Sequence, residues 1–172
     1  MASSDHHHGP GGACAHAAHQ SERAGEALAG AEAACRAKGA RLTPMRREVL
    51  EALYATHRAL GAYDIAEILA GKDGRRLAPI TIYRALDFLM EQGLVHRLAS
   101  RNAFVACPHG HGAGDLVAFL ICEACGGVDE MSSSGVAGAI SDLLAGEGFE
   151  PQMQVLEISG RCAHCVGQVH AA

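Results

Sequence analysis

The sequence predicts an α+β fold: an N-terminal winged helix-turn-helix domain followed by a small α/β dimerisation domain with a four-cysteine zinc site. Helical spacing dominates the first half of the chain, two short apolar segments then form a hairpin, and two Cys-x-x-Cys motifs occupy the second half. We expect a disordered His/Ala/Gly-rich tail at residues 1–20, the winged-helix domain at 21–106, a hinge and metal-ligand loop at 107–115, and the dimerisation domain at 116–172.

Four helices are expected in the first domain. Gly39 ends the first helix, and Thr43 caps the second because threonine is a preferred N-cap and Pro44 loses no hydrogen bond at the first helical position. The expected ranges are 21–38, from 44 onward, 62–69 and 79–90, with a polar loop at 71–77. The residues expected to face the core are Ala24, Leu28, Ala31, Cys35, Val49, Leu50, Leu53, Ile65, Ile68, Leu69, Ile82, Leu86 and Leu89.

A hairpin is expected after Gly93, which ends the fourth helix. Its strands cover 94–98 and 103–106, with Ser-Arg-Asn at 100–102 as the tip. In a winged helix, the last helix enters the DNA major groove and the hairpin touches the phosphate backbone. The first domain is therefore expected to bind double-stranded DNA.

The second domain is expected to contain a small sheet and one long helix. The expected elements are strands at 116–121, 128–131 and 154–159 and a helix at 132–147. The apolar segment 117–121 carries no charge or proline that would protect an exposed edge, so we expect pairing with a second copy of the chain.

Charge is distributed unevenly along the chain. The formal net charge is −5, but residues 36–101 hold 12 of the 14 Lys and Arg against seven acids, a balance of +5. The remaining residues hold two basic and 12 acidic side chains, a balance of −10. A basic half joined to an acidic half indicates that only one domain meets phosphate.

Composition and motifs narrow the functional class. No apolar run approaches the roughly 20 residues that cross a bilayer, and no secretory signal precedes the helices, so we expect a cytoplasmic protein with no membrane partner. The sequence contains no Gly-rich phosphate loop and no His-Glu-x-x-His motif. We therefore expect neither an enzyme nor a small-molecule substrate.

The two Cys-x-x-Cys pairs predict one tetrahedral zinc site. Cys122 with Cys125, and Cys162 with Cys165, each place two thiolates on a tight turn where both can face one ion at about 2.3 Å. A closed four-sulfur shell leaves no position for substrate, so this zinc would be structural. The alternative is a disulfide or redox pair, but the first motif lies between two strands, whereas redox pairs normally start a helix.

A second metal cluster is expected near the boundary between the domains. Its candidate ligands are His96, Cys107, His109, His111 and Glu130. A thiolate together with imidazoles favours zinc, whereas manganese or ferrous iron would favour carboxylates and histidines. Because these ligands come from both sides of the hinge, an ion bound here would set the angle between the domains.

Three segments resemble motifs of the Fur family of bacterial metal-responsive repressors. They are Arg-Leu-Thr-Pro-Met-Arg-Arg-Glu-Val-Leu at 41–50, Thr-Ile-Tyr-Arg-Ala-Leu-Asp-Phe-Leu at 81–89 and Ile-Cys-Glu-Ala-Cys-Gly at 121–126. The resemblance covers about 31–165, and the thiol of Cys107 resembles the zinc-uptake branch of the family. It implies a homodimer that binds a palindromic operator when loaded with zinc and represses zinc-uptake genes.

The resemblance also implies residue roles and two zinc ions per monomer. The four cysteines match the structural site, and His96, Cys107 and Glu130 match ligands of the sensing site. Tyr63 and Arg84 match positions that face bases, and Thr81 and Tyr83 lie in the same DNA-binding segments. Arg84 has the fork suited to guanine O6 and N7; its alternative role is a phosphate contact, and that of Tyr63 is core packing.

This sequence departs from the family pattern in the loop that precedes Cys122 and Cys125. Asp115 occupies the position where zinc-sensing relatives carry a histidine, whereas the histidines of this chain lie earlier. Either His111 or His109 completes the sensing site, with His111 favoured, or Asp115 supplies an oxygen ligand.

Three other functions remain open at this point. A sibling sensor of iron, manganese or peroxide would share the family motifs, although Cys107 argues against it. A zinc enzyme would need an open coordination position. A zinc-ribbon interaction module would not bind DNA, which the basic segment opposes.

Overall fold

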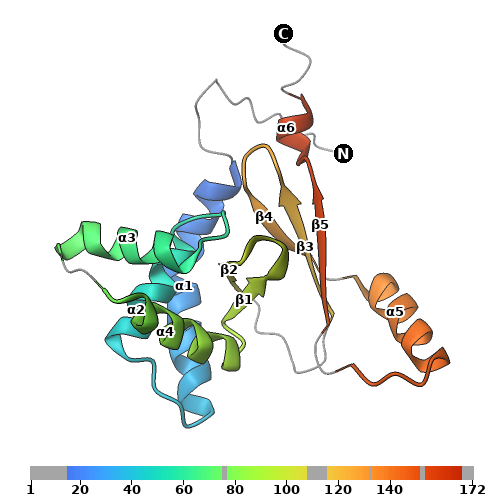
Figure 1. Ribbon diagram of the computed structural model, residues 1–172, viewed down its shortest axis with the longest axis horizontal. Helices are drawn as coiled ribbons and strands as arrows, with labels where there is room; N and C mark the ends of the chain where they lie inside the picture. Colours follow the sequence, from blue (N-terminus) through green and yellow to red (C-terminus); the bar gives the residue numbers. More distant parts are fainter. Residues whose placement is uncertain (1–14, 75–76, 108–115, 132, 152–153, 168–172) are drawn as a thin grey trace.

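The computed structural model describes residues 15–74, 77–107, 116–131, 133–151 and 154–167. Helices α1 to α4 form one group, a small sheet of strands β3, β4 and β5 forms another, and the hairpin β1–β2 lies between the two groups (Figure 1). Within the described residues, no helix is both long enough and apolar enough to cross a membrane.

The helical group packs around one apolar core. Its members are α1 (Ala15–Ala37), α2 (Pro44–Tyr54), α3 (Ala62–Asp73) and α4 (Pro79–Glu91). Helix α2 is central, because it contacts each of the other three. Twelve of the 13 side chains expected to face inward are buried or pack against this core, so the helical periodicity located the core correctly.

Three details of the helices differ from expectation. Helix α1 begins at Ala15, inside the tail that was predicted to be disordered, because the Ala-rich residues after Gly12 favour helix; residues 1–14 lie outside the described part. Helix α3 continues to Asp73 and ends at Gly74 with φ +70°. Ile68 was expected to face inward but is 39% exposed.

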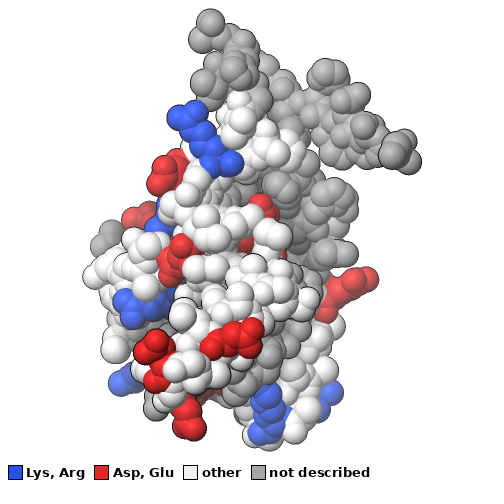
Figure 2. Space-filling model, turned by 90° about the vertical axis from the view of Figure 1, so that its right-hand side faces the viewer, with Lys and Arg blue, Asp and Glu red and all other residues white. Residues whose placement is uncertain are grey.

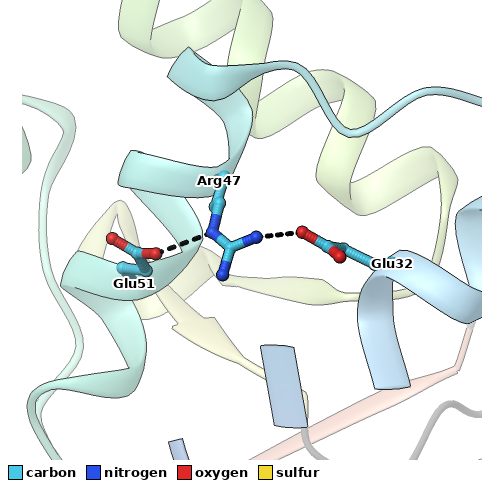
Figure 3. Close-up of polar contacts among 3 residues, drawn as sticks. All are labelled: Glu32, Arg47 and Glu51. Atoms are coloured by element: carbon cyan, nitrogen blue, oxygen red, sulfur yellow. Dashed lines mark hydrogen bonds and ion pairs between the residues drawn. The ribbon is translucent and has the colours of Figure 1, made fainter. Parts of the chain in front are cut away.

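A surface ion pair joins α1 to α2 (Figure 3). The guanidinium of Arg47 donates from Nε to Oε1 of Glu51 at 2.9 Å, and from Nη1 to Glu32 on α1. The hydrogen bond that Arg47 donates to Glu51 and the negative charge of Glu32 raise the pKa of Arg47. Because this cluster is open to solvent, it stabilises the helix pair far less than the core does.

The wing is an antiparallel hairpin. Strand β1 (Val95–Leu98) pairs with β2 (Ala103–Ala106), and the 3₁₀ turn η1 (Ala99–Arg101) forms the tip. Asn102 follows the turn with φ 46°, a left-handed conformation that asparagine tolerates better than most residues. The hairpin agrees with the sequence prediction.

The second sheet has the order β4-β3-β5. Strand β3 (Val117–Cys122) pairs antiparallel with β4 (Val128–Met131) and parallel with β5 (Val155–Gly160). The expectation that 117–121 is an edge strand is therefore wrong, since β3 is central. Because β4 and β5 are hydrogen-bonded to β3 on either side, this apolar strand exposes no edge and needs no protecting charge or proline.

The wing and the second sheet share a small apolar cluster. Leu98 and Val105 of the hairpin pack with Val117, Phe119 and Ile121 of β3. The described residues contain two further helices, α5 (Ser134–Gly146) and the short α6 (Ala163–Gly167). This apolar cluster contains side chains from both sides of the domain limits expected at residues 106 and 116. Those limits therefore stay a prediction.

Candidate metal centres and nucleic-acid interface

The four cysteines of the two Cys-x-x-Cys motifs meet in one cluster. Their sulfur atoms all lie within 4.8 Å of one another, and Sγ of Cys125 lies 4.0 Å from Sγ of Cys162. Thiolates at the corners of a tetrahedron around zinc lie roughly 3.8 Å apart. The donor set and its dimensions therefore suit a closed zinc site.

Backbone amides favour the thiolate form of Cys122. Burial raises its pKa, but amide N–H groups of Cys125, Cys162 and Ala124 and the Cys125 side chain lower it more, to about 6. The amide of Cys162 donates to Sγ of Cys122 at 3.3 Å. Because a metal binds the thiolate and not the thiol, these amides prepare Cys122 as a ligand.

The turn that carries Cys122 and Cys125 also contacts the segment between α2 and α3. Val128 donates its amide N–H to the carbonyl oxygen of His57 at 2.9 Å. A Cβ at Gly127 would lie 2.9 Å from Cδ2 of His57 and 3.2 Å from Sγ of Cys125, so only glycine permits this approach. The neighbouring Gly126 has φ +74°, a conformation that the tight turn requires.

Three of the five expected sensing residues form a second cluster. His96 lies on β1, Cys107 directly follows β2 and Glu130 lies on β4, and their ligand atoms lie within 4.8 Å of one another. The ring of His96 packs on Phe119 with 5.3 Å between centroids. His109, His111 and Asp115 lie outside the described residues, so the fourth ligand stays a prediction.

Cys107 is held by two backbone contacts. Its amide donates to the carbonyl oxygen of Leu94 at 2.9 Å, and Tyr54 Oη donates to its carbonyl oxygen at 3.2 Å. Burial, followed by the negative charges of Cys107 and Glu130, raises the pKa of Tyr54 to about 12, so the phenol stays protonated. Sequence reasoning missed Tyr54, although a tyrosine on the buried face of a helix needs such a partner.

The residues expected to contact DNA lie on α3 and α4. Arg84 is exposed and Tyr63 is 66% exposed, so both are available to a ligand. Thr81 is half-buried, and Tyr83 packs against the helical core, which gives it a structural contact as well. The guanidinium of Arg46 lies 3.4 Å from the ring centroid of Phe88 and stabilises the position of α4 against α2.

Sequence reasoning also missed a contact between β5 and the wing tip. The carboxylate of Glu157 accepts the amide N–H groups of Ala99 at 2.7 Å and Ser100 at 3.2 Å, and the hydroxyl of Ser100. Burial raises the pKa of Glu157, but these three donors lower it more, so the pKa lies below its ordinary value. The partners are 57 and 58 residues apart in the sequence, and no local motif announces them.

A winged helix-turn-helix joined to a small sheet with two clusters of metal-binding side chains defines a metal-binding member of the winged-helix class. The family model of the ferric uptake regulator family matches residues 37–159. The chain belongs to this family, and its named relatives are transcriptional regulators.

Individual relatives agree with this family membership. The chain is 40% identical over 141 residues to the zinc uptake regulation protein of Escherichia coli (strain K12), covering 82% of each chain. It is 33% identical over 133 residues to the peroxide operon regulator of Bacillus subtilis (strain 168), covering 74% of this chain and 85% of the relative. A solved structure of a zinc uptake regulator complexed with zinc and DNA matches with a TM-score of 0.78 and 40% identity, covering 87% of this chain and 98% of that one.

Proposed function

We propose that this protein is a zinc-responsive transcriptional repressor, which binds operator DNA as a zinc-loaded homodimer and represses zinc-uptake genes. The observation that carries the proposal is the cluster of His96, Cys107 and Glu130, because it joins the wing to the sheet. The similarity to regulators named for zinc uptake supports zinc as the signal. The protein would act in the cytoplasm and without a catalytic step.

The four-cysteine cluster would hold a structural zinc. All four sulfur atoms come from the sheet half of the molecule, on the turn after β3 and around the start of α6. A closed shell of this kind contributes directly to folding and offers no open position for chemistry. This site would therefore remain loaded when the cellular zinc concentration falls.

The second cluster would hold the regulatory zinc, giving two zinc ions per monomer. Zinc bound here would supply coordinate bonds between β1, the residue after β2, and β4. His111, His109 or Asp115 would complete the ligand set. With the wing held against the sheet, the position of α4 relative to the second half is restricted, and two copies of α4 can match two halves of a palindromic operator.

The DNA-facing residues would divide their roles. Arg84 on α4 would read guanine, because its exposed guanidinium can donate two parallel hydrogen bonds. Tyr63 lies near the start of α3 and would contact a base or sugar from there. Thr81 and Tyr83 would support this surface from the first turns of α4.

Exposed apolar side chains support a homodimer. Helix α5 has no buried residue in the monomer, and among the described residues it makes no extensive contact with another helix or strand. Leu143 is 65% exposed, Phe149 63% and Ile158 47%. The face of the molecule on the α5 side presents uncharged surface between scattered acidic and basic side chains (Figure 2). Such a surface is typical of an interface between subunits.

The direct test pairs zinc counting with DNA binding. Zinc per monomer is measured before and after mild chelation, and binding to the promoter duplex of a zinc importer is measured on the same samples. We expect operator binding to disappear with one zinc population while a second zinc and the fold persist. Binding that survives chelation, or that returns with iron or manganese and not with zinc, would reject the proposal in favour of a metal-independent DNA-binding protein or a sibling sensor.

A further inference from the structure

Three residues form a row across the second sheet. Phe119 on β3 is directly opposite Glu130 on β4 and Glu157 on β5. Residues directly opposite on paired strands project from the same face of a sheet. One face of the sheet therefore presents a carboxylate, an aromatic ring and a second carboxylate, and all three contact the wing or its flank.

The row meets the hairpin at two places, with Glu130 and Phe119 at His96 and Glu157 at the tip. Glu130 joins His96 and Cys107 in the second metal cluster, and Phe119 packs against the His96 ring. Glu157 binds the tip, where its two carboxylate oxygens accept the amide of Ala99 and the amide and hydroxyl of Ser100. Glu130 meets the wing at the second metal cluster, whereas Glu157 meets it through hydrogen bonds at the tip.

We propose that Glu157 is a positioning residue for the regulatory metal: it holds the wing tip on β5 and so keeps His96 and Cys107 opposite Glu130 before the ion arrives. The inference rests on the proposed function for the identity of the ion. The chain segment between the tip and the metal cluster is short, because Ala99 directly follows β1 and His96 lies only three residues before Ala99.

The physical reason is preorganisation. A ligand set that is already assembled binds its ion more tightly than one that must first be gathered, because the cost of ordering the segments has been met by other contacts. Hydrogen bonds to an ionised carboxylate are stronger than those between neutral groups. The apolar contacts of Leu98 and Val105 with β3 also hold the hairpin, but they are less directional than hydrogen bonds to a carboxylate.

Zinc affinity without DNA is the first measurement. Glu157→Ala and Glu157→Gln are compared with Glu150→Gln, which alters an exposed glutamate before β5. Each protein is prepared with the structural zinc alone, and zinc is titrated against a chromophoric competitor. Losing the charge-assisted bonds should weaken regulatory zinc binding about tenfold in Glu157→Ala and less in Glu157→Gln, which keeps one acceptor oxygen.

Amide hydrogen exchange of the same samples tests whether the contact is independent of the regulatory ion. In the unaltered protein and in Glu150→Gln, the amides of Ala99 and Ser100 should be protected before zinc is added. In Glu157→Ala they should exchange rapidly, while the content of structural zinc and the oligomeric state stay unchanged. Rapid exchange of these amides in the unaltered protein would overturn the proposal.

The outcomes separate this inference from the proposed function. Equal zinc affinity of Glu157→Ala and Glu150→Gln, both folded, would overturn the positioning role whatever the DNA result. Failure of the zinc-loaded unaltered protein to bind DNA would reject the repressor function and leave the zinc titration interpretable. If Glu157→Ala loses its structural zinc, Ser100→Ala decides, because it removes only one bond at the tip: an affinity unchanged in both Ser100→Ala and Glu157→Gln would overturn the proposal.

Discussion

The two metal-type clusters differ in where their residues come from. The four cysteines belong to one half of the molecule, in two turns that follow β3 and β5. His96, Cys107 and Glu130 belong to the hairpin and to the sheet, so their cluster exists only while the two are in contact. A site within one folding unit stabilises that unit, whereas a site between two units reports on their arrangement and can control it.

The largest expected effect comes from the local cluster. Cys122→Ser should remove the structural zinc and unfold the sheet half, because metal-binding energy there is folding energy, on the order of 10 kcal/mol. Zinc content, the thermal unfolding curve and the sedimentation coefficient of the protein would measure this. A folded dimer with normal thermal stability would show that the cluster is not structural, and the distinction between the two sites would then fail.

The second prediction concerns the shared cluster. Cys107→Ser should leave a folded dimer with one zinc and lower operator affinity on the order of 100-fold in the presence of zinc, because one ligand of the regulatory ion is lost. Cys35→Ala is the matched control, since Cys35 is a buried thiol in α1, outside both clusters. Should Cys107→Ser unfold as far as Cys122→Ser, the two sites would not have separate roles.

The third prediction tests whether the residues proposed to contact DNA act independently of both metal clusters. Arg84→Ala should weaken operator binding by about 1–3 kcal/mol and relax the preference for guanine at one position, with zinc content unchanged. Arg47→Ala is the control, because Arg47 is engaged by Glu51 and Glu32. Fluorescence anisotropy with matched and substituted duplexes would measure both, and an equal loss on every sequence would assign Arg84 to phosphate.

The smallest effect is expected from Tyr54, whose phenol donates a hydrogen bond to the carbonyl oxygen of Cys107. Tyr54→Phe removes the hydrogen bond to the Cys107 carbonyl and should lower the free energy of unfolding by about 1 kcal/mol. It should also weaken regulatory zinc binding a few-fold, whereas structural zinc should be unaffected. Chemical denaturation and the competitor titration would measure these quantities, and weaker binding at the structural site instead would contradict the assignment.

Local patterns predicted most of the elements. Apolar residues at helical spacing located α2 and α4, and Gly39 and Gly93, the two glycines expected to end helices, both adopt positive φ. The errors arose where neighbours along the chain were not decisive. Ile68 fits a helical stripe, but its exposure depends on what α3 packs against, and the central place of β3 depends on the distant β5.

The sequence by itself predicted the four-cysteine cluster, because two cysteines three residues apart can face one ion through local turn geometry. The pairing of β3 with β5 then brings the two pairs together. The sequence also pointed to His96, Cys107 and Glu130, through residue chemistry and family resemblance. Only the tertiary structure decided how that cluster is held: Tyr54 reaches Cys107 across 53 residues, and Glu157 reaches Ser100 across 57. These contacts result from the packing of the wing on the sheet. Residues that meet in this way are not marked by any periodicity or motif spacing in the sequence.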